Sequence, residues 1–276
     1  MPVSREELFS FLNQRGIRLV MPEGSDEKWV RTFARLRETY EGTDGRVHPT
    51  YSLHSTTSRI QTTTPNIFMY RLDHIQPAPG KIVLPISPAK FESVYLANLK
   101  GEAMLAKELA ETQDTLGDFL LKQFGLPLDA RSSRYARMVF FQGLYGKADP
   151  NTVEKHEGDI PAHPRWEEFL QKWPGLVAPA EVEFRKVQSR QAWAQISDIL
   201  LRVAVEYEEK FPGTLTGIWM DTLIIECSFR FKEPIEAWLT DKFREATGYQ
   251  FKMHTFGHKI VNPDDRKSKF QILFES

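Results

Sequence analysis

The chain has 276 residues, of which 41% are hydrophobic, including 19 phenylalanines. This composition suits a folded protein with a sizeable core and excludes broad disorder. Because 36 basic residues balance 37 acidic ones, net charge alone does not drive nucleic-acid binding, and any such surface has to be local. The single cysteine, Cys227, excludes an internal disulfide framework and a cysteine-rich zinc site.

The N-terminus carries no apolar signal region, and no run approaches the ~18 apolar residues that a membrane span requires. A single cysteine also fits a reducing compartment. We therefore expect a soluble, intracellular protein of the cytoplasm with no membrane partner.

Two helices are expected at the start of the chain. Ser4 and Glu7 fit a capping box, in which the Ser hydroxyl accepts from the third helical N–H, and Gly16 suits the helix end. A second amphipathic helix is expected from about Ser25 to Gly42. The next segment, 46–73, is rich in Thr, Ser and β-branched residues without a helical period, which predicts strands and loops.

The middle of the chain predicts one short strand and several helices. Residues 81–86 read KIVLPI and predict a strand in which Pro85 lies at an end or at an irregular site, since proline has no N–H for a ladder. After it we expect a helical pattern at 91–124, a helix at 132–146, a surface loop at 148–164, and helices at 166–173 and 181–211.

Two apolar runs near the C-terminus predict a β-hairpin. They cover Leu215–Met220 and Leu223–Phe231 and flank the two-residue junction Asp221-Thr222. A helix at 233–247, a strand at 251–256 and a flexible basic tail at 262–276 are expected after it. Strands interrupted by helix-rich insertions indicate an α+β protein, with an antiparallel sheet that carries a helical subdomain.

A polar segment from Asp44 to Phe68 combines arginines with two clusters of Thr and Ser. These side chains donate hydrogen bonds well to phosphates and groove edges. The same composition is also typical of a polar loop or an edge strand, so both interpretations stay open for this segment alone.

Within the helix expected at 132–146, Arg134, Arg137, Phe141 and Tyr145 lie at spacings of three and four and share one face. Arginines followed by aromatic rings suit a triphosphate whose base stacks on a ring. The alternative is that the rings belong to the core and the arginines face water.

Asp221 stands at the expected hairpin tip, where rigid strands hold its carboxylate in a position that suits a metal ligand. An Asp in a turn more often serves the backbone, so this signal is also ambiguous by itself.

In their order along the chain, these segments resemble the polymerase domain of family A DNA polymerases, the bacterial DNA polymerase I type. GRVHPTYSLHSTTSRIQTTTPNI is similar to the family's primer-template segment, and KIVLPISPAKFESVYLANL to motif A. RYARMVFFQGLYG is similar to motif B, AQISDILLRVAVE to the helix before motif C, and WMDTLIIEC to motif C. The resemblance runs in one order from about Trp29 to Gly257.

The resemblance implies roles for individual residues. Asp221 matches the catalytic, magnesium-binding aspartate of motif C, and Glu226 matches a later Glu of that motif. The implied nucleotide-binding residues are Glu92, Arg134, Arg137, Phe141 and Tyr145. The implied DNA-binding residues are Arg46, Thr57, Arg59, Asn66 and Gln195.

The first motif A aspartate is missing, because the position five residues before Glu92 is Ser87. In the family, two carboxylates hold two magnesium ions that activate the primer hydroxyl and stabilise the leaving pyrophosphate. Serine is neutral and a poor magnesium ligand, so a Mg2+ site here is expected to be weakened. Further departures are Leu116 for a phosphate-facing His, Ser133 for the first Arg of motif B, and Thr222 for the Glu of motif C.

The fold that the resemblance implies is an antiparallel palm sheet with a helical fingers subdomain and a reduced or absent thumb. We expect N-terminal helices and the first part of the palm at 1–100, and a fingers-like helical subdomain at 101–180. The second part of the palm with the motif C hairpin is expected at 181–261, and the flexible tail at 262–276.

The leading hypothesis is a polymerase-like protein that binds primer-template DNA with impaired or absent nucleotidyl transfer, acting as a replication subunit or regulator. One alternative is an active DNA-directed DNA polymerase subunit of a split enzyme, whose second chain supplies a thumb or exonuclease. Another is a protein-interaction scaffold that binds no DNA. The segment KSKFQILF at 267–274 resembles a sliding-clamp binding peptide, which implies the clamp as a further partner.

Overall fold

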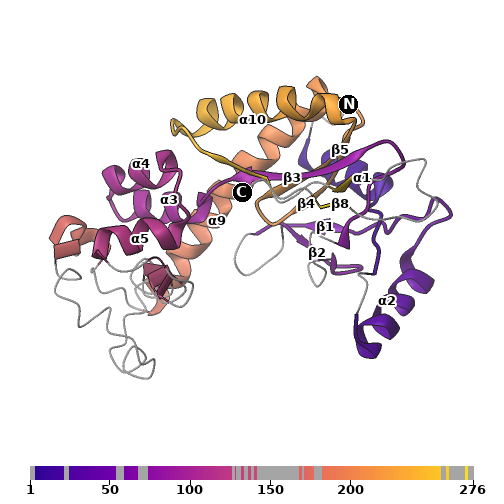
Figure 1. Ribbon diagram of the computed structural model, residues 1–276, viewed down its shortest axis with the longest axis horizontal. Coiled ribbons are helices and arrows are strands. Elements are labelled where there is room, and N and C mark those ends of the chain that lie inside the picture. Colours follow the sequence, from indigo (N-terminus) through magenta and orange to yellow (C-terminus); the bar gives the residue numbers. More distant parts are fainter. Residues whose placement is uncertain are drawn as a thin grey trace. The chain divides into compact units, whose positions relative to one another are not determined.

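The computed structural model describes most of the chain. The described residues are 4–21, 25–53, 59–67, 74–125, 128, 132–133, 136–137, 140–141, 168–169, 171–176, 182–255, 259–260 and 271–272. The chain divides into two compact units (Figure 1). The first unit comprises 1–88, 197–247 and 253–276, and the second comprises 89–196 and 248–252. Each of the two units is assembled from separate stretches of the chain, whereas the four expected segments are consecutive. The assignment of those segments to palm and fingers stays a prediction.

The first unit is built on an antiparallel sheet that has six strands among the described residues. The strands are β3 (Ile82–Pro88), β4 (Leu215–Trp219), β5 (Thr222–Cys227), β6 (Met253–Thr255), β7 (Lys259–Ile260) and β8 (Gln271–Ile272). Their order is β4-β5-β3-β7-β8, and β6 also pairs with β3. Together with the helices, this sheet confirms the predicted α+β class. β8 lies inside the segment predicted to be a flexible tail, where two residues pair with β7.

β3 is the central strand, and all of its residues are buried. β5 pairs with it from Ile82 to Ile86 on one edge. On the other edge, among the described residues, β7 pairs with Ile82 and Val83, and β6 pairs from Ile86 onward. Pro85 therefore lies mid-strand where the second ladder is interrupted, which is the irregular site that a residue without an N–H requires.

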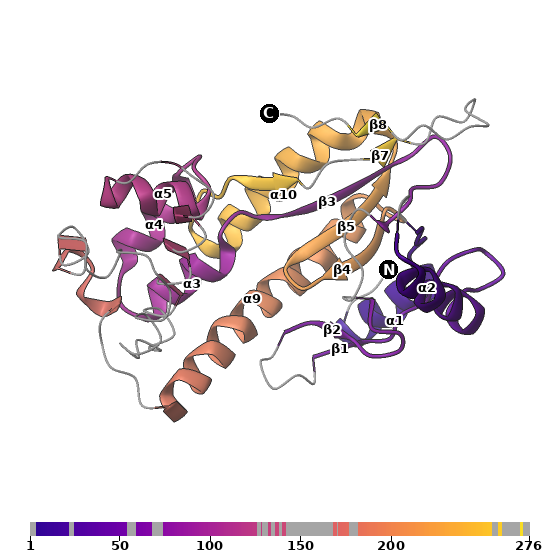
Figure 2. The same cartoon turned by 60° about the horizontal axis from the view of Figure 1, so that its bottom comes forward.

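Helices and a short hairpin complete the first unit. They are α1 (Arg5–Arg15), α2 (Glu27–Tyr40), α10 (Lys232–Thr247), and the hairpin of β1 (Tyr51–Ser52) and β2 (Gln61–Thr62). The predicted capping box is confirmed, since the Glu7 N–H donates to Ser4 Oγ at 3.1 Å and the Ser4 N–H donates to Glu7 Oε2 at 2.9 Å. Figure 2 shows α1 beside β1 and β2, and α10 contacts β3. One apolar cluster of the core is formed by Ile17, Leu19, Phe33, Leu36, Val47, Ile67, Ile75, Val83, Trp219 and Ile224.

The second unit is helical. The helical pattern expected at 91–124 is confirmed, and it forms three helices, namely α3 (Phe91–Leu99), α4 (Ala103–Glu111) and α5 (Leu116–Phe124). Gly101 takes φ 79° between the first two, and the Thr115 side chain caps α5 by accepting the Asp118 N–H. α5 packs closely at Gly117, where an added Cβ would lie 1.8 Å from Ser133 Oγ.

The long helix α9 (Val182–Lys210) contributes residues up to 196 to the second unit and the remainder to the first. It matches the helix expected at 181–211 to within one residue at each end. Among the described residues, none of the helices is long and apolar enough to cross a membrane.

Candidate functional site

Asp221 lies in a two-residue turn that joins β4 to β5. The register pairs Trp219 with Thr222, so the turn is Met220-Asp221 and begins one residue before the expected junction. The turn begins earlier than expected because Met220 takes the left-handed conformation, at φ 57°, that tight hairpins demand. The β-branched Thr222 belongs to strand β5 instead of to the turn. The Thr222 hydroxyl lies 3.4 Å from Asp221 Oδ1, and the Asp221 side chain is half-buried.

Ser87 lies at the same end of the sheet as this turn. The pairing of β3 with β5 ends where Ile86 lies opposite Leu223. Because the two strands are antiparallel, Ser87, which follows Ile86 in β3, lies at the end of the sheet where Asp221 precedes β5. On its other side Ser87 pairs with His254 of β6, and directly opposed residues in antiparallel strands point to the same face. His254 was not predictable from the sequence, because no local signal indicates a pairing between segments so far apart.

The donor set at this end of the sheet is poor for magnesium. Asp221 supplies a carboxylate, whereas Ser87 supplies a neutral, buried hydroxyl. Across the described residues, His, Cys, Asp and Glu side chains do not gather in any group of three or more able to hold a metal ion. The residues present therefore do not fit a site in which two magnesium ions share two carboxylates.

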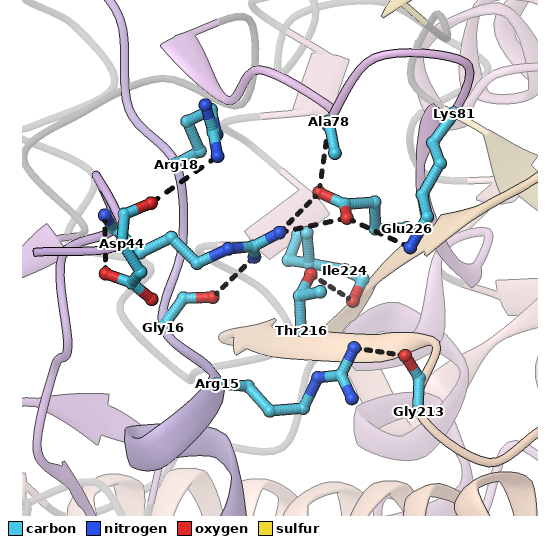
Figure 3. A network of polar contacts seen from close by, with 11 residues as sticks. Arg15, Gly16, Arg18, Asp44, Ala78, Lys81, Gly213, Thr216, Ile224 and Glu226 are labelled. Atoms are coloured by element: carbon cyan, nitrogen blue, oxygen red, sulfur yellow. Dashed lines mark hydrogen bonds and ion pairs between the residues drawn. The ribbon is translucent and has the colours of Figure 1, made fainter.

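Arg46, predicted to bind DNA, lies in a buried ionic network with Glu226. Figure 3 shows Glu226 of this network between Ala78 and Lys81. The Nη2 atom of Arg46 is 3.0 and 3.1 Å from the two carboxylate oxygens of Glu226, and its Nη1 atom donates to the Gly16 carbonyl at 3.2 Å. Glu226 also accepts the Ala78 N–H at 3.3 Å and lies 3.5 Å from Lys81 Nζ. Since a buried charge needs partners, this set satisfies Glu226 and ties the segment around Arg46 to β5.

The segment around Arg46 is fixed at its other end by His48. The His48 ring contacts Asp44 Oδ1 at 3.2 Å and the Asn13 carbonyl at 2.7 Å. The Arg18 guanidinium also reaches the Asp44 carbonyl, at 3.5 Å (Figure 3). Gly16 is required beside this segment, because it takes φ 62° and a Cβ there would lie 2.8 Å from the His48 ring.

The remaining predicted DNA-binding residues are placed only in part. Arg59 is half-buried and Asn66 is exposed in the first unit, whereas Gln195 is exposed on the part of α9 that belongs to the second unit. Thr57 lies outside the described residues. Their common role stays a prediction.

Among the predicted nucleotide-binding residues, Glu92 has a partner that no local sequence pattern indicates. Trp193 of α9 donates its indole N–H to Glu92 Oε1 at 2.9 Å, and the Trp193 ring is buried. Arg137 is exposed and Phe141 is half-buried, with the Phe140 ring 5.9 Å from the Phe141 ring between centroids. Arg134 and Tyr145 lie outside the described residues.

Comparison with models of known protein families and with curated proteins finds no match. Among solved structures, the chain is similar to the POL domain of Pol1 from M. smegmatis in complex with DNA primer-template and dNTP, with a TM-score of 0.65 and 14% sequence identity. The similarity covers 84% of this chain and 50% of that chain, so it spans only half the length of the solved chain. The fold of the chain thus resembles the POL domain of a family A polymerase.

Proposed function

We propose that the chain is a family A polymerase-like protein that binds primer-template DNA and has lost most or all nucleotidyl transfer. One observation carries the proposal: within a fold similar to a polymerase domain, Ser87 stands at the strand end beside the Asp221 turn. The residue that would supply the second acid is a buried serine. Such a protein would serve as a replication subunit or regulator.

The chemical argument rests on charge. A polymerase of this family holds magnesium between two carboxylates, one from each of two neighbouring strands. With Ser87 in place of one of them, Asp221 is the carboxylate that this end of the sheet keeps among the two matched positions. Loss of a bridging ligand weakens transition-state stabilisation, and we expect the transfer rate to fall by roughly several powers of ten.

DNA binding is proposed to use residues whose chemistry suits phosphates and base edges. Arginine pairs with phosphate, and Thr, Asn and Gln side chains exchange hydrogen bonds with the sugar-phosphate backbone and with bases. The proposed DNA-binding residues are Arg46, Thr57, Arg59, Asn66 and Gln195. A residual nucleotide site is proposed at Glu92, Arg134, Arg137, Phe141 and Tyr145, where cations suit a triphosphate and rings suit a base.

Primer extension tests the lost activity. Wild type, Ser87→Asp and Ser87→Asn are compared on a primer-template with magnesium and all four dNTPs. We expect wild type and Ser87→Asn to be inactive, and Ser87→Asp to gain magnesium-dependent incorporation because it alone restores a second carboxylate. Template-directed extension by wild type that disappears in Asp221→Ala would instead identify an active polymerase subunit.

Titration with primer-template DNA tests the binding. We expect affinity to fall with rising salt, as it does when basic side chains displace counterions from phosphates. Arg59→Gln should weaken binding, whereas Arg244→Gln, an exposed arginine of α10, is the control and should not. Absence of measurable binding at low salt would favour a protein-interaction scaffold.

A further inference from the structure

Lys90 and Lys252 converge on the loop between α4 and α5 in the second unit, where Lys122 of α5 also binds Asp114. Lys90, which precedes α3, donates from Nζ to the carbonyls of Thr112 at 3.2 Å and Asp114 at 3.0 Å. Lys252 reaches the carbonyl between them, on Gln113, at 3.4 Å. Two ammonium groups from distant parts of the chain therefore bind successive carbonyls of one loop.

The backbone holds the two lysines together. The Ala89 N–H donates to the Lys252 carbonyl at 2.8 Å, so the residue next to Lys90 is bonded directly to Lys252. Lys90 itself takes the left-handed conformation, at φ 59°. Residues other than glycine rarely adopt this conformation, because it strains the backbone. The position of the Lys90 side chain is therefore held at a cost in backbone conformational energy.

The carboxylate of Asp114, which lies near Lys90, already binds another lysine. Among the described residues, the carboxylate within electrostatic reach of Lys90 is that of Asp114. Lys122 occupies both of its oxygens, at 2.6 and 2.8 Å. The adjacent Asp118 accepts from the Thr115 hydroxyl at 2.8 Å instead. Within the described part of the chain, Lys90 and Lys252 thus direct their ammonium groups at carbonyl dipoles of this loop.

The pKa of Lys90 reflects both its burial and its charged neighbours. Burial lowers the pKa of Lys90, the neighbouring charge of Lys252 lowers it further, and Asp114 opposes both. An anion placed between the two ammonium groups would offset the repulsion between them.

We propose that Lys90 and Lys252 bind a phosphate group beside the loop at 112–114. A compact ammonium is a good point-charge partner for phosphate oxygens, and two of them at a fixed spacing bind a dianion better than either alone. The phosphate comes either from a free pyrophosphate or nucleotide or from a DNA backbone. The site uses none of the residues assigned to DNA or nucleotide under the proposed function. A failure of one proposal therefore leaves the other unaffected.

Amine labelling of the intact protein tests the site. Labelling of each lysine is followed by mass spectrometry without divalent cations, at ionic strength held constant with KCl. The probes are sodium pyrophosphate, a dNTP and a short DNA duplex. We expect at least one probe to slow labelling of Lys90 and Lys252 in a saturable way, while Lys107, an exposed lysine of α4, labels at an unchanged rate. Protection by pyrophosphate and dNTP identifies the free phosphate, and protection by the duplex alone identifies the backbone.

The variant Lys252→Gln separates binding from folding, because this exposed side chain makes one long contact with the loop. We expect it to keep the wild-type unfolding midpoint without ligand and to raise the half-saturating probe concentration about tenfold. Lys107→Gln is the matched control and should bind like wild type. Equal protection in Lys252→Gln and wild type would overturn the proposal, as would protection by none of the three probes beyond that of KCl.

Discussion

The guanidinium of Arg46 binds the carboxylate of Glu226, which follows it 180 residues later, and the two side chains are only 15% and 3% exposed. Removing one partner of a buried pair leaves an uncompensated charge, which is far more costly than losing a surface pair. The pair thus decides how firmly the segment around Arg46 is attached to β5.

We expect Arg46→Met to lower the free energy of unfolding by about 3 kcal/mol, because Glu226 loses its main partner. Urea denaturation measures the change. Arg31→Met is the control, since Arg31 pairs with Glu27 in open solvent and its loss should change stability by no more than about 0.5 kcal/mol. Equal effects of the two substitutions would contradict the role assigned to burial.

The tight contact at Gly117 predicts a rescue between two residues. We expect Gly117→Ala to destabilise the protein by about 1–3 kcal/mol, because its Cβ would overlap the Ser133 side chain. Adding Ser133→Gly removes the atoms that clash, so the double variant should recover most of the loss in thermal unfolding. If the double variant were as unstable as the sum of the single changes, the two residues would not share this contact.

The buried carboxyl of Glu208 predicts a pH dependence of stability. Burial raises the pKa of Glu208, although the N–H groups of Gly213 and Leu215 and the charge of Arg15 oppose the effect. A raised pKa means that the folded state holds the proton more tightly than the unfolded state. The contribution of Glu208 to stability is therefore fully present below its ordinary pKa and is lost as the pH rises through the folded value.

Glu208→Gln removes that titration while keeping an oxygen acceptor. We expect the variant to gain stability relative to wild type as the pH rises from about 4 to 8, measured by chemical denaturation across that range. Glu209→Gln, at the exposed neighbouring position on α9, should follow wild type. A difference between Glu208→Gln and wild type that is constant with pH would exclude the titration.

The single cysteine predicts a clean reporter of unfolding. Burial, opposed by the charge of Lys81 and assisted by that of Glu226, raises the pKa of Cys227 to about 11. At pH 8 only about one thiol in a thousand would then be thiolate, so we expect the native protein to resist a thiol reagent. Colour from Ellman's reagent should appear at the rate of unfolding in urea. Rapid stoichiometric labelling of the native protein would contradict this burial.

Features set by neighbouring residues were predictable from the sequence. The Ser4–Glu7 capping box, the β4–β5 hairpin and β3 follow from patterns a few residues long, and the structure has all of them. The helical character of 91–124 followed from its apolar repeat too, whereas the helix boundaries, such as the one at Gly101, were not assigned from the sequence.

Contacts between distant segments were not predictable in the same way. Nothing in the local sequence around Glu92 indicates that Trp193 donates to it, and nothing around Ser87 indicates His254. Such pairs depend on how strands and helices meet in three dimensions, where the partner is selected by packing rather than by spacing along the chain. The resemblance to a polymerase domain supplied the positions of candidate residues, whereas their partners came from the structure.

During synthesis on a ribosome, β3 emerges long before the strands that flank it. Its residues end up wholly buried, yet β5 and β6 lie far later in the chain. At 5–20 residues per second, each further 100 residues takes on the order of 10 s, during which both edges of an apolar strand are open to other chains. The yield of this protein in a cell should therefore depend on chaperones that shield the nascent chain, and slower translation between β3 and β5 should increase aggregation.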